Sequence, residues 1–211
     1  MALATALVGE FCQVQAQTEF RKKEQRMTVT GGVILETNVS GFFHSGINNG
    51  QSRVKVGGTV GGFVDLGISD SFSVQGEMLF HYKHSEFEWG SVPGKFSYRG
   101  LEVPLYAMYH IRFKGDRQLY LGAGPYTEFG LEATYRYNGM KSDLYEKDGR
   151  DGQPVMRDSN TGFGLKIGYE FSSGLQLNVS YKASFTNMLN VDNVKLCPHA
   201  ASIGLAYRFG R

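Results

Sequence analysis

Large apolar residues recur at every second position in eight stretches of the chain, the period of β-strands whose two faces meet different surroundings. No 3.6-residue helical period competes over these stretches, and no run of about 18 apolar residues could form a spanning helix. Each stretch has about ten residues or more, enough for a tilted strand to cross a hydrocarbon core. The stretches are 28–40, 54–68, 72–83, 98–113, 118–136, 162–171, 174–186 and 200–209.

Short and long connections alternate between the predicted strands. Tight links fall at 69–70, 114–117 and 172–173, whereas long polar connections rich in Gly, Asn, Asp, Lys and Ser fall near 41–52, 84–96, 137–160 and 187–199. This asymmetry is typical of an all-β, eight-stranded antiparallel up-and-down transmembrane β-barrel with short periplasmic turns and long external loops. Both termini would then be periplasmic. A soluble sandwich has no physical reason to keep its long loops at one end, although Greek-key crossovers can mimic the pattern.

The two faces of the predicted strands differ in volume and charge. One face is nearly all large and apolar, and the other mixes glycine with charges of both signs. An eight-stranded barrel is just wide enough for side chains to fill, so about thirty large apolar side chains must point outward, toward lipid. A soluble lipocalin-like barrel would instead need a charged exterior. Aromatic residues near strand ends are expected to form interfacial girdles: Tyr82, Tyr98, Phe113, Tyr135 and Tyr207.

The charged residues of the polar face have two interpretations. They line a selective water path, or they pair with one another and plug the lumen. Because unpaired buried charge is costly, mutual pairing is favoured, and combined mutation of Glu102 and Arg112 should then be non-additive. The predicted inward polar network is Glu77, Glu102, Arg112, Glu128, Lys166, Glu170, Lys182 and Arg208.

Two prolines interrupt adjacent predicted strands. If Phe113 lies opposite Leu119, Pro104 faces Glu128 and Pro125 faces Ala107. Proline removes a ladder hydrogen bond, and a closed barrel has no free edge where that loss is harmless. This register therefore predicts a local bulge or bend at the prolines.

Composition narrows the function classes. The chain has 211 residues, of which 41% are hydrophobic and 20% charged, and a formal net charge of +2. The signs are well mixed, without the basic stripe of a phosphate-tracking surface, so no nucleic-acid partner is expected. Residues 1–16 are predicted to be a signal peptide that ends at Val14-Gln15-Ala16, followed by a periplasmic segment at 17–27 and the barrel domain at 28–211. After cleavage only Cys197 would remain, so no intramolecular disulfide is expected.

Candidate chemistry is scarce. The five histidines are scattered, no zinc-ligand spacing occurs, and no metal or cofactor is expected. An enzyme acting on envelope lipids would need a Ser/His or Asp/His pair near the external rim, where His84 lies beside Ser85 and Glu86. A loop histidine beside a carboxylate is usually a solvent-exposed residue without a catalytic role, so the prediction is that the protein is not an enzyme.

Several segments resemble strands of the PorT-like outer-membrane β-barrel family of Bacteroidota. They are LEVPLYAMYHI, YLGAGPYTEFGL, FGLKIGYEFSSGLQLNVSYKASFTNM and SIGLAYRF, and the resemblance covers residues 54–209. It implies an outer-membrane location and insertion by the barrel-assembly machinery. The expected role is structural or interactive at the cell surface. Expected contacts are outer-membrane lipid, lipopolysaccharide and an envelope protein bound through the external loops. The alternatives are a narrow pore for ions or small solutes, a lipid-modifying envelope enzyme, or a subunit of a secretion apparatus, because the family includes such a subunit.

Overall fold

The structure is a computed structural model that describes residues 27–45, 51–89, 92–137, 140–146, 154, 156–188 and 195–210. The predicted signal peptide and all but the last residue of the segment at 17–27 lie outside the described residues. In the part that is described, no helix has the length and apolar character to cross a membrane. The strands are β1 Thr28–Ser45, β2 Gln51–Gly67, β3 Phe72–Trp89, β4 Val92–Phe113, β5 Arg117–Tyr137, β6 Met140–Asp143, β7 Ser159–Glu170, β8 Leu175–Ser184 and β9 Lys195–Phe209.

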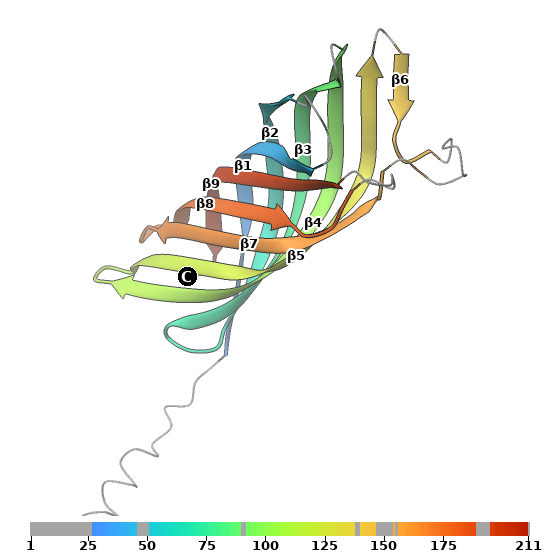
Figure 1. Cartoon of the computed structure of the whole chain (residues 1–211). Helices are drawn as coiled ribbons and strands as arrows, with labels where there is room; N and C mark the ends of the chain where they lie inside the picture. The colour runs from blue at the N-terminus through green and yellow to red at the C-terminus, as the bar shows by residue number, and fades with distance from the viewer. Residues whose placement is uncertain are drawn as a thin grey trace, which may run out of the picture.

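Eight of these strands close into an antiparallel barrel (Figure 1). The order around the wall is β4-β3-β2-β1-β9-β8-β7-β5, and pairing of β4 with β5 completes the ring. The short strand β6 continues the sheet outside the ring by pairing with the end of β5, from Thr134 to Tyr137. The predicted eight-stranded antiparallel barrel is therefore confirmed, with β6 as an addition that the sequence pattern did not predict.

The barrel has two different ends. At one end lie the tight turns between β2 and β3, β4 and β5, and β7 and β8, together with the start of β1 and the end of β9. We call this the short-turn end and the opposite one the loop end. Two turns use left-handed backbone, with φ of 78° at Gly115 and 85° at Gly174. A Cβ on Gly174 would also lie 2.8 Å from the Arg208 carbonyl oxygen, so glycine is required there.

Several strands extend farther at the loop end than their apolar alternation indicated. The expected loop at 84–96 is largely strand, because β3 runs to Trp89 and β4 begins at Val92. Backbone pairing overrides the polar composition of this hairpin, since a chain that leaves a strand opposite a partner can keep adding ladder hydrogen bonds. The tips at 46–50, 138–139, 147–153 and 189–194 lie outside the described residues.

The predicted register of the β4–β5 hairpin is wrong. Phe113 pairs with Arg117, which places Pro104 opposite Tyr126, while Pro125 faces Phe163 on β7. The turn is tighter than expected because Gly115 and Asp116 both adopt positive φ. The β4–β5 register is the same on both sides of the prolines, so the predicted bulge is absent there.

The bulge in this hairpin lies nearer the loop end. The β4–β5 register shifts between Arg99 and Gly100, because Arg99 pairs with Glu132 and Gly100 with Gly130. Leu131 is the extra residue in β5. The prolines interrupt single hydrogen bonds, whereas the bulge changes which β5 residues face outward.

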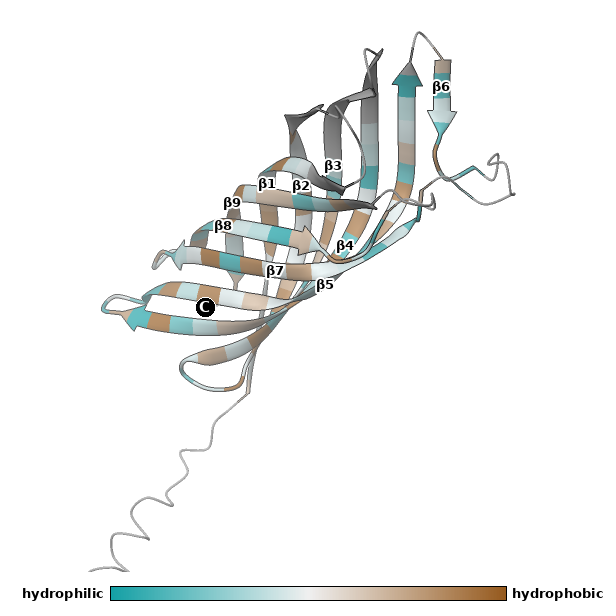
Figure 2. Ribbon diagram, viewed as in Figure 1, coloured by the Kyte–Doolittle hydropathy of each residue, from teal (hydrophilic) through white to brown (hydrophobic). Residues whose placement is uncertain are grey.

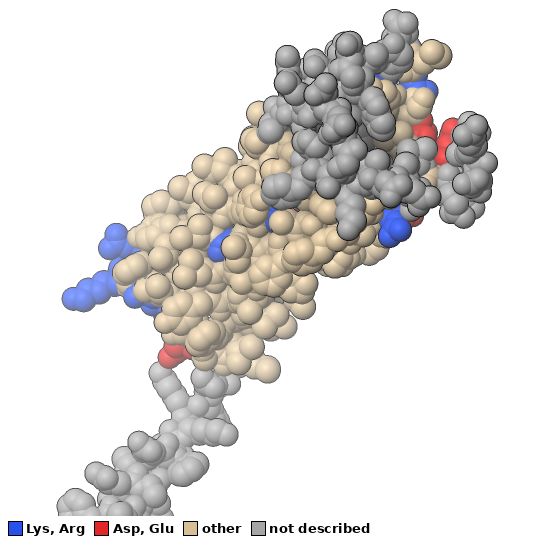
Figure 3. Space-filling model, viewed as in Figure 1, with Lys and Arg blue, Asp and Glu red and all other residues tan. Residues whose placement is uncertain are grey.

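The outward face of the barrel is apolar (Figure 2). Val60, Phe80 and Leu205 are each at least half exposed, as are many other large apolar residues of the wall. In the visible face of Figure 3, Lys, Arg, Asp and Glu side chains gather mainly toward the two ends of the barrel, with a band of other residues between. Tyr98 does not join a girdle. The parity that sends Val103 outward turns Tyr98 inward, and it is only 3% exposed.

Candidate functional site

The barrel interior holds a concentration of buried charge. In the described part of the chain, six acidic residues and three basic ones are buried inside the wall. They alternate with outward apolar residues along the same strands, so the two-residue period of each strand positions them. The acids are Glu36, Asp65, Glu77, Glu102, Glu128 and Glu170, and the bases are Lys166, Lys182 and Arg208.

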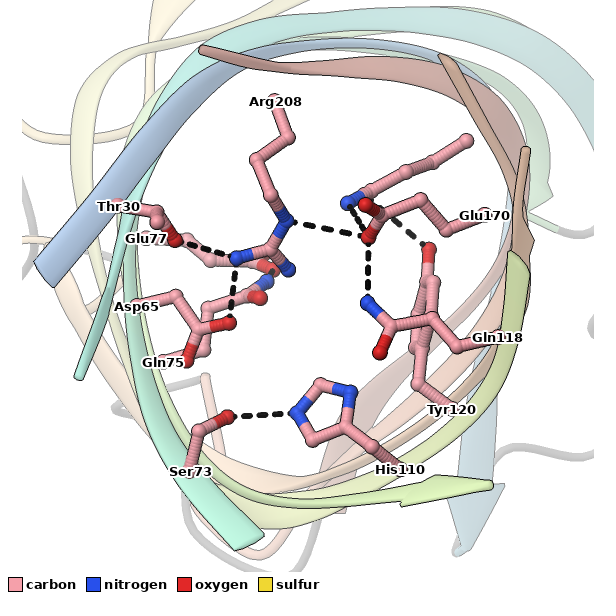
Figure 4. A network of polar contacts seen from close by, with 11 residues as sticks. Thr30, Asp65, Ser73, Gln75, Glu77, His110, Gln118, Tyr120, Glu170 and Arg208 are labelled. Atoms are coloured by element: carbon pink, nitrogen blue, oxygen red, sulfur yellow. Dashed lines mark hydrogen bonds and ion pairs between the residues drawn. The ribbon is translucent and has the colours of Figure 1, made fainter. Parts of the chain in front are cut away.

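The group nearest the short-turn end is organised by Arg208 on β9 (Figure 4). Its Nη1 lies 2.7 Å from Asp65 Oδ2 on β2, and its Nε lies 3.1 Å from Glu170 Oε2 on β7. The same Nη1 donates a hydrogen bond of 2.5 Å to Thr30 Oγ1, and Gln118 Nε2 donates one of 2.8 Å to Glu170 Oε2. One guanidinium therefore links β9 to β1, β2 and β7, using donors in the fixed fork that suits carboxylates.

A second group is centred on Lys166 of β7. Its Nζ lies 2.5 Å from Glu77 Oε1 and 3.7 Å from Glu36 Oε1, and it lies 5.4 Å from the centre of the Tyr106 ring. Gln75 Nε2 donates a further hydrogen bond of 2.6 Å to Glu77 Oε1. The Lys166 ammonium is thus shared between β1, β3 and the aromatic face of a β4 residue.

Two more pairs lie nearer the loop end. Lys182 on β8 forms an ion pair with Glu102 on β4. His81 Nε2 lies 2.5 Å from Glu128 Oε1, and Asn160 Nδ2 donates to Glu128 Oε2 at 3.2 Å. Each pair joins strands that are not neighbours in sequence, so the interior is cross-linked by charge over much of its length.

A short segment between β6 and β7 packs against buried residues near the loop end of the barrel. The buried side chains of Tyr98, Ala133, Met156 and Met188 pack together, and Leu144 and Tyr145 pack against them. Backbone hydrogen bonds hold the segment in place, from Leu144 N to Ala133 O at 2.9 Å and from Arg157 N to Met188 O at 2.8 Å. We call this cluster, Tyr98, Ala133, Leu144, Tyr145, Met156 and Met188, the apolar cap.

The short-turn end opens instead into a cavity of about 470 Å³. Its lining includes His110, Arg112 and Arg208. His110 Nε2 lies 2.7 Å from Ser73 Oγ, whereas His110 Nδ1 has no hydrogen-bond partner among the described residues. A nucleophilic hydroxyl needs a base that a third group orients, so this geometry does not form a triad.

The structure places seven of the eight predicted network residues in the interior and brings them together as the four groups above. Arg112 is the exception. It lies at the open mouth of the short-turn end, where 62% of its side chain is exposed and Asp70 Oδ1 is 3.8 Å away. The expected coupling of Glu102 with Arg112 is wrong, because ten positions of β4 separate the two and Lys182 is the partner of Glu102.

Three ionisable participants were missing from the predicted network: Glu36, Asp65 and His81. The signal was available in each case, since every one of them has the parity of the polar face in its own strand. An odd or even position along a strand predicts which face of the wall a residue lies on, but it does not predict the partner of that residue. The partners come from β7, β9 and β5 respectively, and only closure of the barrel brings those strands across the lumen.

The described residues do not form a metal site. No group of three or more His, Cys, Asp or Glu side chains among them is placed to hold a metal ion. The side chains of His84, Ser85 and Glu86 lie outside the part that is described.

Comparison with solved structures links the chain to outer-membrane barrels. It is similar to the outer membrane protein OprG from Pseudomonas aeruginosa, with 13% identity, a TM-score of 0.56, and coverage of 89% of this chain and 98% of that one. It also matches Ail, the attachment invasion locus protein of Yersinia pestis, at 16% identity, covering 87% and 100%, with a TM-score of 0.46. The outer membrane enzyme PagL matches at 12% identity, covering 87% and 100%, with a TM-score of 0.44.

At 13% identity, the similarity to OprG shows the fold alone. No curated protein sequence matches the chain. A family model described as "Outer membrane protein beta-barrel domain" matches residues 15–190. The alternating strands, the apolar exterior and the polar, cross-linked interior agree with that match. The chain belongs to the outer membrane protein β-barrel domain family.

Proposed function

We propose that this protein is a small outer-membrane barrel with a structural or surface-interaction role, and that its lumen is plugged by paired charges. The observation that carries the proposal is the set of four groups of paired polar and charged side chains in the interior, together with the apolar cap. Buried charges that are paired and hydrogen-bonded cross-link the wall, whereas a conducting path needs polar groups that water can reach.

A planar-bilayer recording tests the plug. The wild-type protein should give no single-channel steps, because the Lys166 and Lys182 ammonium groups reach across the lumen to carboxylates on β3 and β4. A matched variant, Lys166→Ala with Lys182→Ala, removes both cross-links and is expected to produce small steps. Steady single-channel steps from the wild-type protein would overturn the plug and favour the narrow pore.

The proposal also assigns the two ends to compartments. We infer that the short-turn end faces the periplasm and the loop end faces outside, because barrels of this class keep short turns on the periplasmic side. In a Cys197→Ser background, Asp143→Cys should react with a membrane-impermeant maleimide on intact cells. Ser173→Cys should react only after lysis. The reverse pattern would contradict the orientation.

We also propose protein partners for the loop end of the barrel. Loops on a rigid scaffold commonly carry recognition, so an envelope protein is expected to bind at the loop end, and the barrel-assembly machinery is expected to insert the chain. The resemblance to the PorT-like branch supports a search for secretion-apparatus partners. Crosslinking in native outer membranes, followed by identification of co-purifying proteins, tests this. Recovery of the barrel alone would favour a purely structural role, for which no catalytic group is needed.

A further inference from the structure

A hollow lies in the outward face of the barrel, across β1 to β5, with a volume of about 580 Å³. Gly58 forms part of its floor, and a Cβ atom built there meets nothing within 4 Å. The surrounding side chains are large and mostly apolar. They are Leu35, Val60, Phe80, Tyr82 and Leu131, with Arg99 at the margin.

Arg99 marks the edge of the apolar band. Counting along β4 from Phe113, the outward residues are all apolar until Arg99. On β5 the outward residues from Leu119 are likewise uncharged until Glu132, the partner of Arg99. Gly58 pairs with Tyr82 and Tyr82 with Arg99, so the floor of the hollow and its charged margin lie on one row across the wall.

The charges at this margin leave an excess of positive charge. Arg99 Nη1 lies 3.3 Å from Glu132 Oε2, and Lys141 Nζ lies 3.3 Å from Glu132 Oε1. Two cations share one carboxylate, so the cluster carries a net charge of +1. The Arg99 side chain is 66% exposed, and its Cζ lies 5.8 Å from the centre of the Tyr82 ring. The guanidinium is therefore held above the hollow and still has donors for another anion.

Two bulges flank the hollow. The β2–β3 register shifts between Val54 and Gly58, and the β4–β5 register shifts between Arg99 and Gly100. Bulges bend a strand and change where its side chains point. The missing side chain at Gly58 and the bends on both sides explain why the wall is hollowed here. A barrel wall that only packs against lipid does not need such a depression.

We propose that this hollow holds an acyl chain of a phosphorylated, multiply acylated lipid of the lipid A class, with Arg99 and Lys141 binding its phosphate. The apolar depression suits a chain that lies in the hydrocarbon region, and the cations at its margin suit a phosphate at headgroup level. The inference rests on the proposed orientation, which puts this margin in the outer leaflet. An anionic phospholipid has similar charge and is the alternative that the experiment separates.

The test uses the full-length barrel in phosphatidylcholine nanodiscs that contain equal small amounts of lipid A and phosphatidylglycerol. Native mass spectrometry measures which lipids stay bound after the disc is removed. The wild-type protein should retain lipid A in preference to phosphatidylglycerol. Arg99→Gln should lower this retention about two- to fivefold, the range for one exposed ion pair.

A second variant fills the hollow without disturbing the wall. Gly58→Trp places its side chain in open space, so it should fold and still lose bound lipid A. Val64→Trp is the matched control, because Val64 is an outward residue of the same strand outside the hollow. Its retention of lipid A should equal that of the wild-type protein.

Equal retention by Gly58→Trp and wild-type protein would overturn the inference, and so would equal retention of phosphatidylglycerol and lipid A. The maleimide pattern at Asp143 and Ser173 separates this result from the proposed function. If the lipid selectivity is absent and the labelling pattern is as expected, only the proposed lipid site is excluded. Labelling of Ser173→Cys on intact cells overturns the orientation itself.

Discussion

The buried carboxylates inside this barrel differ in the number and distance of their hydrogen-bond and ion-pair partners. Glu77 Oε1 receives Lys166 Nζ at 2.5 Å and Gln75 Nε2 at 2.6 Å. Glu36 has Lys166 at 3.7 Å, and neither of its carboxylate oxygens has a hydrogen-bond partner among the described residues. Both side chains are almost fully buried. Acids outnumber lysines and arginines in the interior, so not every carboxylate has a close cation. Neutralising Glu77 should therefore lower the stability of the barrel, whereas neutralising Glu36 should raise it.

Neutralising the two acids separately checks this contrast. Glu77→Gln should destabilise the barrel by about 3 kcal/mol, because it leaves the buried Lys166 with one distant partner. Glu36→Gln should stabilise it by about 1 kcal/mol, because it removes a buried charge without a hydrogen bond. Urea unfolding in lipid vesicles measures both, and gel migration before and after boiling controls for folding. Equal losses in the two variants would contradict the account.

The Glu102–Lys182 pair permits a sharper test of the plug at the same scale. A double-mutant cycle with Glu102→Gln and Lys182→Met should give a coupling of about 1–3 kcal/mol, because the two side chains form a direct buried ion pair. The matched cycle replaces Lys182→Met by Arg112→Gln. It should be additive within about 0.5 kcal/mol, because Arg112 lies at the mouth. Coupling in the second cycle and none in the first would reverse the assignment.

At the scale of elements, the structure departs most from the expectation in the connection between β5 and β7. The sequence pattern predicts a long polar loop at 137–160, and the described part of that segment instead contributes β6 and three residues of the apolar cap. Gly130, beside the β4–β5 bulge, leaves room for the ring of Tyr145, because a Cβ atom built on Gly130 would overlap the tyrosine hydroxyl. The packing of Tyr145 in the cap therefore depends on the missing side chain at Gly130.

Gly130→Ala tests that dependence. The added methyl group should displace Tyr145 and loosen residues 140–146, and chymotrypsin should then cleave at Tyr145 faster than in the wild-type protein. Global stability should fall by less than about 1 kcal/mol, because the ion pairs of Arg208, Lys166 and Lys182 do not include residues of the cap. Gly58→Ala is the matched control, since its Cβ meets open space. An unchanged cleavage rate in Gly130→Ala would show that Tyr145 does not depend on this space.

At the scale of the whole molecule, the apolar exterior and the polar interior form an arrangement that suits a lipid bilayer. Val179 lies within β8 with about half of its side chain exposed, between outward neighbours Leu177 and Tyr181. In water such a surface would drive aggregation, whereas in a bilayer it removes the need to satisfy polar groups on that face.

A charge scan of this surface measures where the bilayer lies. Val179→Lys should cost about 2–4 kcal/mol in lipid vesicles, as for a cation near the bilayer midplane of a barrel. Phe209→Lys, at the short-turn end, should cost about 0–1 kcal/mol because its ammonium reaches the interface. Urea titrations in lipid vesicles provide both values. Equal costs at the two positions would contradict a membrane boundary between them.

The sequence by itself determined the strand count of the barrel, the outward apolar face and most members of the interior network. These properties depend on a two-residue period and on side-chain volume, both of which are local to each strand. Phe63 and Gly61, for example, take the interior face that their parity predicts. The end at which short turns gather also follows from spacing along the chain.

Tertiary structure alone decided which charges meet, how the hairpins are registered and where the wall is hollowed. Parity could not separate Lys182 from Arg112 as the partner of Glu102, because partners across the lumen are set by barrel closure, and register depends on the dihedral angles of Gly115 and Asp116. The row from Gly58 through Tyr82 to Arg99 likewise joins three strands whose alignment depends on two bulges. The two-residue period of a strand predicts which face of the sheet a side chain lies on, but not its height in the barrel or its partner. The ion pairs and the hollow in the outward face therefore arise only when the strands close into a ring.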